Sequence, residues 1–340
     1  MLLIVGCYAT EGLEGLHLYA FDQACASFTH LDAVNLTSPS YLTIECDLLY
    51  VVDELKNEQA RLVALRVEDN KLTLLNDCKT GDASPCHVSK YNDLVATANY
   101  RGGSLSLFRI GETGKIQSLL SVIKGSTGGP DPLRQDVPHV HCALFSPDGK
   151  YLFATDFSAD RIIRLELSRD GVGDDIKSWP LPYPGGYGPR HLLFSADGQF
   201  LYVIGELSDC ITVFKNQGGN LTELQTLVAD EDHGRGGAHL LFSPDGRFLY
   251  SSHRRKNDKI VIFSVDRQTG ILTRIGSQPT MHHPRQFCIS PDGRHLLVTS
   301  MDDNCIQVFN RNPMSGVLTP IDRTLMVEAP AFVGFLPLQA

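Results

Sequence analysis

Short apolar stretches separated by polar turns recur along the chain, and one phrase marks them. Ser146-Pro-Asp-Gly-Lys-Tyr-Leu-Phe returns in related form from Ser195, Ser243 and Ser290. An Asp-Gly pair between two apolar stretches predicts a tight hairpin turn. An alternating strand such as Ile211-Thr-Val-Phe follows, and a Gly/Asn-x-Leu-Thr phrase such as Gly219–Thr222 opens a fourth strand. Four short strands per roughly 48 residues predict the blade of a β-propeller.

The residues that open the first strand of each unit set the count: Pro39, Pro85, Val140, Pro189, Gly237, Pro284 and Pro330. The strands Leu2–Val5 and Leu16–Phe21 and the segment from Ser27 are predicted to complete the unit that begins at Pro330, because a closed ring leaves no exposed sheet edge. We therefore expect residues 1–340 to form one all-β domain, a seven-bladed propeller with four-stranded antiparallel blades and very little helix. The Asp-Gly turns are expected at the outer rim.

Composition and charge narrow the function classes. The net charge of −9 and pI near 5.7 disfavour general binding to nucleic acid or to an anionic membrane surface. Nine scattered cysteines without a CxxC pair indicate reduced thiols, so a cytoplasmic location is expected. The segment Leu3-Ile4-Val5-Gly6-Cys7 resembles a lipoprotein cleavage site, but its apolar run is shorter than the roughly 7–15 residues of a signal peptide. We expect it to be a strand.

Candidate chemistry follows from the ring geometry, because the innermost strand of each blade lines the central channel. The residue after each opening position gives a first ring: Ser40, Cys86, His141, Arg190, Ala238, Arg285 and Ala331. The next position gives a second ring: Tyr41, His87, Cys142, His191, His239, Gln286 and Phe332. A third ring lies eight residues after each turn glycine: Phe157, Glu206, Arg254 and Met301, with Glu54 and Asn99 from two weaker repeats.

Charged side chains gather on neighbouring units of these rings: His141, Arg190, Glu206, Arg254 and Arg285. Buried charge is costly unless it is paired. The group is therefore either a structural network between blades or a pocket for a small, multiply anionic ligand, whose carboxylate or phosphate matches the arginine fork. The long Gly/Pro-rich segment 125–141 leads into the group and favours the pocket, since extended loops on a rigid scaffold often carry function.

Several motifs in this region are specific: Arg134-Gln135, Pro138-His139-Val140-His141, Gly188-Pro189-Arg190-His191, Glu206 and Pro284-Arg285-Gln286-Phe287. They resemble the seven-bladed β-propeller lactonase family, which includes a bacterial 6-phosphogluconolactonase and the fungal 3-carboxy-cis,cis-muconate lactonizing enzyme. The resemblance covers essentially the whole chain. One departure is Gly237-Ala238-His239, a looser version of the histidine-bearing strand of the family, which leaves the role of His239 open.

The resemblance implies that the catalytic residues are His141, Glu206, Arg190 and Arg285. Together with the rings, it gives a substrate-binding set of Arg254, His191, His239, Arg134, Gln135 and His87, with no metal and no cofactor. The predicted activity is hydrolysis of an anionic sugar lactone, foremost 6-phosphogluconolactone. His141, with a pKa suited to neutral pH, is expected to be the general base. Arg190 or Arg285 is expected to stabilise the oxyanion while the other, with Arg254, holds the phosphate.

For Glu206 the sequence leaves two roles open, orienting an arginine or transferring the proton to the ring oxygen.

Other functions remain open at this stage. A carboxymuconate cycloisomerase would use the same cationic ring. A metal-dependent gluconolactonase of the six-bladed kind would use Glu54 and Asn99 as ligands, although seven repeats and the lack of a clear acidic ligand set disfavour it. A non-enzymatic interaction propeller would present apolar patches on its face rather than a cationic channel.

Overall fold

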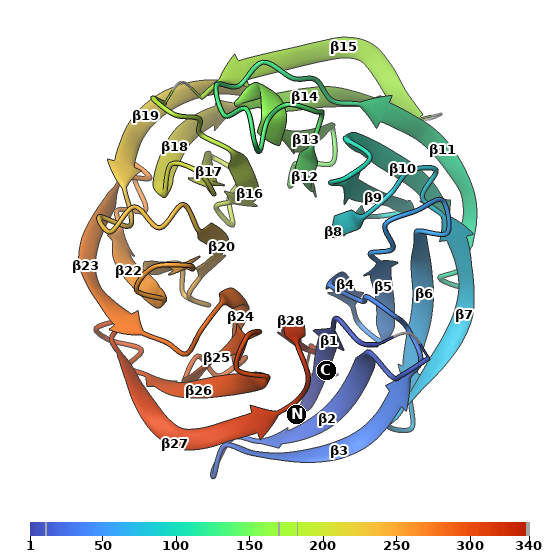
Figure 1. The fold of residues 1–340 in the computed structure, drawn as a ribbon, viewed down its shortest axis with the longest axis vertical. Coiled ribbons are helices and arrows are strands. Elements are labelled where there is room, and N and C mark those ends of the chain that lie inside the picture. Colours follow the sequence, from blue (N-terminus) through green and yellow to red (C-terminus); the bar gives the residue numbers. More distant parts are fainter. Residues whose placement is uncertain (11, 169–170, 182, 338–340) are drawn as a thin grey trace.

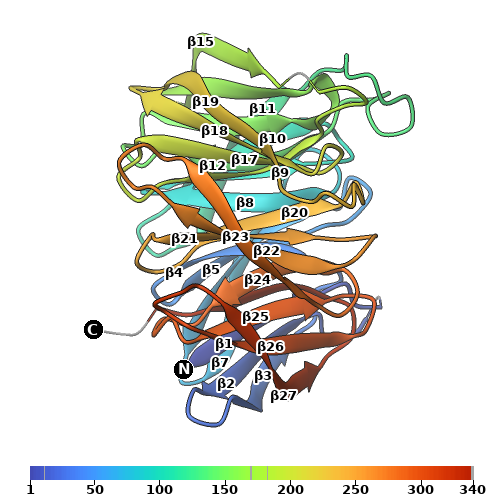
Figure 2. The ribbon, with the colours of Figure 1, turned by 90° about the vertical axis from the view of Figure 1, so that its left-hand side faces the viewer.

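Seven four-stranded antiparallel sheets surround a central axis in the computed structural model, which confirms the predicted seven-bladed propeller (Figure 1). The structure describes residues 1–340 except 11, 169–170, 182 and 338–340. Within each sheet the strands step outward from the axis, and Figure 2 shows the blades from the side. The innermost strands are β4, β8, β12, β16, β20, β24 and β28.

The bounds of the elements follow the repeat closely. The first three sheets contain β28 (Pro330–Phe335), β1 (Leu2–Cys7), β2 (Leu16–Asp22) and β3 (Ser27–Val34); β4 (Tyr41–Glu45), β5 (Leu48–Asp53), β6 (Arg61–Glu68) and β7 (Lys71–Lys79); and β8 (Pro85–Tyr91), β9 (Leu94–Asn99), β10 (Ser104–Ile110) and β11 (Ile116–Lys124). The next two contain β12 (Val140–Phe145), β13 (Tyr151–Asp156), β14 (Arg161–Ser168) and β15 (Gly171–Pro180); and β16 (Pro189–Phe194), β17 (Phe200–Gly205), β18 (Cys210–Gln217) and β19 (Asn220–Val228). The last two contain β20 (Gly237–Phe242), β21 (Phe248–His253), β22 (Lys259–Val265) and β23 (Leu272–Pro279); and β24 (Pro284–Ile289), β25 (His295–Ser300), β26 (Cys305–Arg311) and β27 (Leu318–Met326).

Helix is confined to η1 (Phe157–Ala159), a 3-10 turn, among the residues that the structure describes. Over the same part of the chain, no helix has the length and apolar character needed to cross a membrane. The segment Leu2–Cys7 is the strand β1, as predicted, and it pairs antiparallel with β28 from the other end of the chain. The ring is therefore closed by strands from both ends.

The repeated Ser-x-Asp-Gly phrase forms the same turn each time. In the copy that follows β12, the Ser146 hydroxyl donates to Asp148 at 2.7 Å and accepts the backbone N–H of Tyr151 at 3.0 Å. Gly149 adopts the left-handed conformation that glycine permits (φ 68°). The expected location at the outer rim is wrong, because the turns join the first and second strands, on the inner half of each blade. They lie at the end of the inner strand opposite His141.

The hydrophobic core lies between neighbouring blades. Leu105 and Leu107 of one sheet, for example, pack with Leu152 and Leu165 of the next. The second strand of a blade is apolar on both faces because both faces are covered, and every residue of β17 is buried. The fourth strands lie at the periphery and are mostly exposed, with half-buried residues at alternate positions, as in the second half of β19. Packing of each blade on two neighbours fixes the inner strands around the channel.

A β-bulge opens most of the inner strands. The pairing register shifts between Val140 and Cys142 in β12 and between Pro189 and His191 in β16, and β8, β20 and β24 have the same irregularity. Strict alternation would send consecutive side chains to opposite faces of a sheet, whereas a bulge re-aims one of them. This explains how residues from two successive rings, such as Arg190 and His191, both belong to the channel.

Candidate functional site

Glu206 follows β17 and is the centre of a cluster of four arginines. Its Oε1 lies 2.7 Å from Nη2 of Arg134 and 3.1 Å from Nη2 of Arg255. Its Oε2 lies 3.1 Å from Nη2 of Arg254 and 3.3 Å from Nε of Arg190. The predicted meeting of Glu206, Arg190 and Arg254 is present, with Arg134 from the β11–β12 loop and Arg255, which the sequence did not single out. Four guanidinium groups face one carboxylate, so positive charge is in excess.

Glu206 and Arg254 are both charged at neutral pH. Burial acts to raise the pKa of Glu206, but Arg254, Arg134, Arg190 and Arg255 hold that pKa well below its usual range. Burial lowers the pKa of Arg254 to about 9, while the Glu206 carboxylate acts in the opposite direction. Glu206 is therefore ionised and Arg254 protonated at pH 7. A carboxylate this acidic is suited to orienting arginines rather than to transferring a proton.

His141 lies on β12 beside this cluster. Its ring Nδ1 is 3.7 Å from the Sγ of Cys86, and its ring centroid is 5.3 Å from that of Tyr100. Burial and the positive charges of Arg190 and Arg285 hold the pKa of His141 well below its usual range, although the Glu206 charge opposes them. The expectation of a pKa suited to neutral pH is therefore wrong for His141. The imidazole is neutral at pH 7, which is the form that accepts a proton.

Three further histidines line the channel beside His141. Nδ1 of His191 lies 3.0 Å from Nδ1 of His239, and the His191 ring is 5.3 Å from the His87 ring. Tyr41 stacks on His87 with 4.5 Å between the ring centroids. All of these histidines are buried, and burial followed by the charge of Arg190 lowers the pKa of both His87 and His239 to about 3. The structure thus brings the three predicted histidines together as neutral side chains in the channel wall.

The departure at Gly237-Ala238-His239 has a steric reason. A Cβ at Gly237 would lie 2.3 Å from the backbone oxygen of Gly205 in the neighbouring blade, so only glycine fits there. Ala238 is buried, and its backbone oxygen accepts a hydrogen bond from Nη1 of Arg190. The small residues let Arg190 reach across to this blade, and His239 stays in the channel through its contact with His191.

Arg285 of β24 belongs to a second hydrogen-bonded group. Its Nη2 donates to the hydroxyl of Tyr8 at 2.7 Å, and that hydroxyl donates to Oε2 of Glu54 at 2.7 Å. Ser40 also donates to Oε2 of Glu54. Burial acts against the charged form, but Tyr8 and Glu54 raise the pKa of Arg285 above its ordinary value. Arg285, the fourth predicted catalytic residue, is therefore held through Tyr8 by the carboxylate of Glu54 rather than by that of Glu206.

The third ring needs one correction. The residues that directly follow the second strands are Tyr8, Glu54, Tyr100, Phe157, Glu206, Arg254 and Met301. Asn99 is the last residue of β9, and its amide donates to Ser104 and Ser106 within the blade. Tyr100 takes the predicted place of Asn99 and accepts a hydrogen bond from Nη2 of Arg134 at 3.1 Å. Glu54 and Asn99 therefore do not form the ligand pair that a six-bladed metal-dependent gluconolactonase would need.

The β11–β12 loop delivers Arg134 to the site. The backbone N–H groups of Arg134 and Leu133 donate to Oδ1 of Asp131 at 3.0 and 2.8 Å. Gln135 is 2% exposed, and its side chain hydrogen-bonds to the backbone of Asp131 and Phe157 and to the carboxylate of Asp160. Gln135 thus anchors the loop, and its contact with a substrate stays a prediction.

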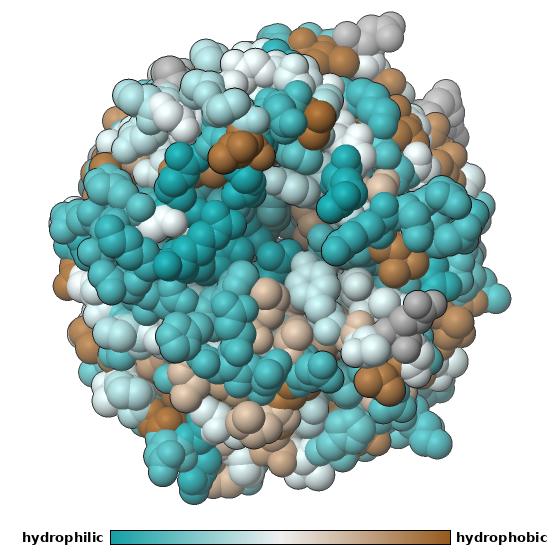
Figure 3. All heavy atoms as spheres, viewed as in Figure 1, coloured by the Kyte–Doolittle hydropathy of each residue, from teal (hydrophilic) through white to brown (hydrophobic). Residues whose placement is uncertain are grey.

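The face seen in Figure 1 is hollowed near its centre, where the inner strands surround the axis (Figure 3). Most side chains around this hollow are hydrophilic, and the hydrophobic residues on this face are scattered singly or in small groups. A protein-interaction propeller would present a contiguous apolar patch instead. The face therefore resembles a site for a polar ligand.

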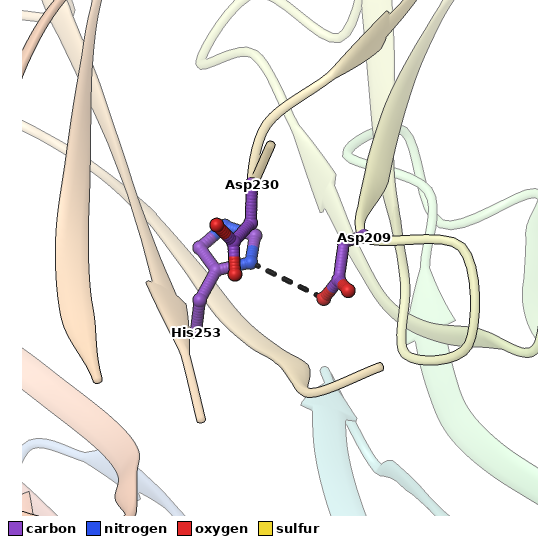
Figure 4. A group of neighbouring side chains, drawn as sticks. All are labelled: Asp209, Asp230 and His253. Carbon is purple, nitrogen blue, oxygen red and sulfur yellow. Dashed lines mark hydrogen bonds and ion pairs between the residues drawn. The ribbon is translucent and has the colours of Figure 1, made fainter. Parts of the chain in front are cut away.

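A separate buried group contains Asp209, Asp230 and His253, which approach one another closely enough to hold a cation (Figure 4). Asp209 accepts the backbone N–H groups of Arg235 and Gly236 at 2.6 and 3.0 Å. Asp230 pairs with the ammonium group of Lys259 at 2.6 Å. Lys259 thus supplies positive charge to Asp230, and Asp209 holds the loop that precedes β20. We assign the group a structural role.

Comparison with known proteins places this geometry in a family. The family described as lactonase, seven-bladed β-propeller, matches residues 2–335. A 6-phosphogluconolactonase from Formosa agariphila is 32% identical over 92% of this chain and 93% of its own length, and one from Bacillus subtilis is 30% identical over 98% and 97%. The structure of a periplasmic gluconolactonase from Pseudomonas aeruginosa superposes with a TM-score of 0.92 at 31% identity and covers 100% of both chains. The chain belongs to the lactonase family of seven-bladed β-propellers.

Proposed function

We propose that this chain hydrolyses an anionic sugar lactone, 6-phosphogluconolactone foremost. The observation that carries the proposal is the excess of positive charge around Glu206, at the channel wall that also holds the neutral base His141. Arg190 and Arg254 are only 2% and 3% exposed. Buried cations are costly without a counter-charge, so the cluster is suited to an anionic ligand. The names of the two relatives point to the same substrate.

The residues support a hydrolytic step in which His141 is the general base. The imidazole takes a proton from water as the water oxygen attacks the lactone carbonyl carbon. The carbonyl oxygen becomes an oxyanion, which Arg190 or Arg285 stabilises as a fixed cation in a water-poor site. When the bond to the ring oxygen breaks, the proton on His141 passes to that oxygen, so lactone and water yield the hydroxy acid. Charge developing on the oxyanion raises the proton affinity of His141 at the moment of reaction.

Glu206 acts in this scheme by orienting arginines. Its ionised carboxylate holds Arg190 and Arg254 in place. Preorganised cations contribute most when they do not have to move during the reaction. Tyr8 and Glu54 do the same for Arg285.

A direct assay tests the proposal. Purified protein is given 6-phosphogluconolactone or unphosphorylated gluconolactone, with and without chelator, and acid release is followed above the uncatalysed background. We expect hydrolysis of both, a higher kcat/KM on the phosphorylated lactone, and no loss with chelator. Equal rates on both lactones would remove the phosphate-binding role, and absence of hydrolysis of either would refute the proposed activity. A carboxymuconate substrate in the same series tests the cycloisomerase reaction.

We also propose a cytoplasmic location. All nine cysteines are free in the structure, and Cys25 and Cys46 are exposed. Exposed free thiols suit a reducing compartment. Cell fractionation with a fusion tag at the C-terminus tests this, and recovery of the protein in a periplasmic or membrane fraction would contradict it.

A further inference from the structure

Two of the arginines around Glu206 differ from the other two in exposure. Arg134 and Arg255 both approach Oε1, and their side chains are 29% and 44% exposed. Arg190 and Arg254 approach Oε2 and are almost fully buried. The cluster therefore has an inner pair within the protein and an outer pair that solvent reaches.

The outer pair is held by a set of contacts between loops. Arg134 is fixed by Tyr100 and by the turn at Asp131. Arg255 donates from Nη1 to the backbone oxygen of Arg235 at 2.9 Å, and the guanidinium of Arg235 pairs with Asp131. The β11–β12 loop is thus tied to the loop that precedes β20 and to the loop that follows β21. Both arginines are positioned before any ligand arrives, which lowers the entropic cost of binding.

The backbone of Arg255 supports a functional role. Arg255 has φ 76°, which lies in the left-handed region that residues other than glycine, asparagine and aspartate rarely adopt. Such strain persists only where the surroundings impose it, and it is concentrated at functional sites. At Arg255 this backbone conformation accompanies a half-exposed guanidinium that pairs with Glu206.

We propose that Arg134 and Arg255 form the subsite for the phosphate group of the substrate; this inference rests on the proposed lactonase function. A phosphate monoester carries about −1.5 to −2 charge at pH 7 and has three acceptor oxygens. It can accept hydrogen bonds from two guanidinium forks at once and offset the charge that Glu206 leaves uncompensated. A guanidinium has five N–H donors, so Arg255 can bind phosphate while it keeps its bond to Arg235. The inner pair and Arg285 remain for the lactone ring.

Kinetics on two lactones test the subsite. Arg255→Gln and Arg134→Gln remove one charge each, and Arg101→Gln is the matched control, because Arg101 is an exposed arginine next to Tyr100. For Arg255→Gln we expect kcat/KM on 6-phosphogluconolactone to fall roughly 10- to 100-fold, mostly through KM, and at least fivefold more than on gluconolactone. Arg255→Lys should restore part of the loss, and Arg101→Gln should change either substrate less than about threefold.

A direct binding measurement separates this inference from the proposed activity. Inorganic phosphate is titrated into the wild-type protein and the three glutamine variants by calorimetry. We expect binding to weaken at least tenfold in Arg134→Gln and Arg255→Gln but not in Arg101→Gln. Suppose that the wild type binds phosphate but hydrolyses no lactone, and that Arg134→Gln and Arg255→Gln weaken this binding. The subsite would then stand, and the proposed activity would fail. Equal losses on both lactones, or unchanged phosphate binding in Arg255→Gln, would overturn the subsite.

Discussion

Replacing Glu206 with glutamine is the sharpest test of the electrostatic centre of the site. The change keeps the shape of the side chain and removes the one negative charge that lies within 3.3 Å of four arginines. Arg134 and Arg255 are partly exposed, so solvent screens their contribution. Arg190 and Arg254 are buried, and removing the partner of a buried ion pair costs about 3–5 kcal/mol. We expect the free energy of unfolding of Glu206→Gln to fall by about that amount.

Urea unfolding followed by fluorescence measures this loss, and Glu112→Gln, at an exposed turn, is the control. Exposed substitutions of this kind change stability by less than about 0.5 kcal/mol. Added phosphate should stabilise Glu206→Gln more than the wild type, because the anion then occupies an uncompensated cluster. A ligand at 100 times its Kd contributes about 2.7 kcal/mol. A Glu206→Gln protein within 1 kcal/mol of the wild type, with the same response to phosphate, would refute this account.

Four further outcomes are expected. His141→Ala should lower kcat by about 10²- to 10⁴-fold in the lactone assay, and unchanged turnover would exclude His141 as the base. Tyr8→Phe removes the hydroxyl that links Arg285 to Glu54 and should lower kcat/KM roughly 10-fold, whereas an unaltered value would mean that Arg285 needs no such support. The pKa of His239 is about 3 in the folded state and about 6.5 in the unfolded state. Between these two pH values the folded state binds fewer protons than the unfolded state. The free energy of unfolding therefore falls as the pH is lowered from about 6.5 towards about 3. Urea titrations at pH 7, 6, 5 and 4 should show a shallower fall for His239→Gln, and an identical slope would contradict the shift. Ser290→Ala, at a buried turn hydroxyl that accepts the backbone N–H of His295, should cost about 1–3 kcal/mol in urea unfolding, and a neutral change would show that the turn does not need it.

The blades could be predicted because their signals are local. Each Ser-x-Asp-Gly turn specifies its own hairpin through contacts within six residues, as at Ser146 and Tyr151. The equivalence of blades then placed His141, Arg190, Glu206, Arg254 and Arg285 around one channel. In the repeat that begins at Pro85 the turn glycine is missing, so the ring position could not be counted from it. The sequence therefore indicated Asn99, whereas Tyr100 is the residue that follows the second strand of this blade.

Other features of the site depend on distances that a repeat does not encode. Arg255 lies one residue beyond the predicted ring, and it pairs with Glu206 from a left-handed backbone conformation that the repeat does not indicate. Tyr8 follows β1, whose blade is completed from the other end of the chain, so no turn phrase marks it. The low pKa of His141 arises from burial beside arginines on other blades, which a neutral-pH expectation for histidine does not include.

The closure of the ring also means that the candidate site needs both ends of the chain. β1 is made before the other strands described and its partner β28 after them, and Arg285 and Tyr8 are separated by 277 positions. Joining ends this far apart costs about 5 kcal/mol of chain entropy, which the completed first blade must offset. The Glu206 cluster draws on residues 134–255, so none of its members comes from the strands that close the ring. Arg285 meets Tyr8 only when the ring is closed, so the predicted catalytic set is held in place only in the complete ring.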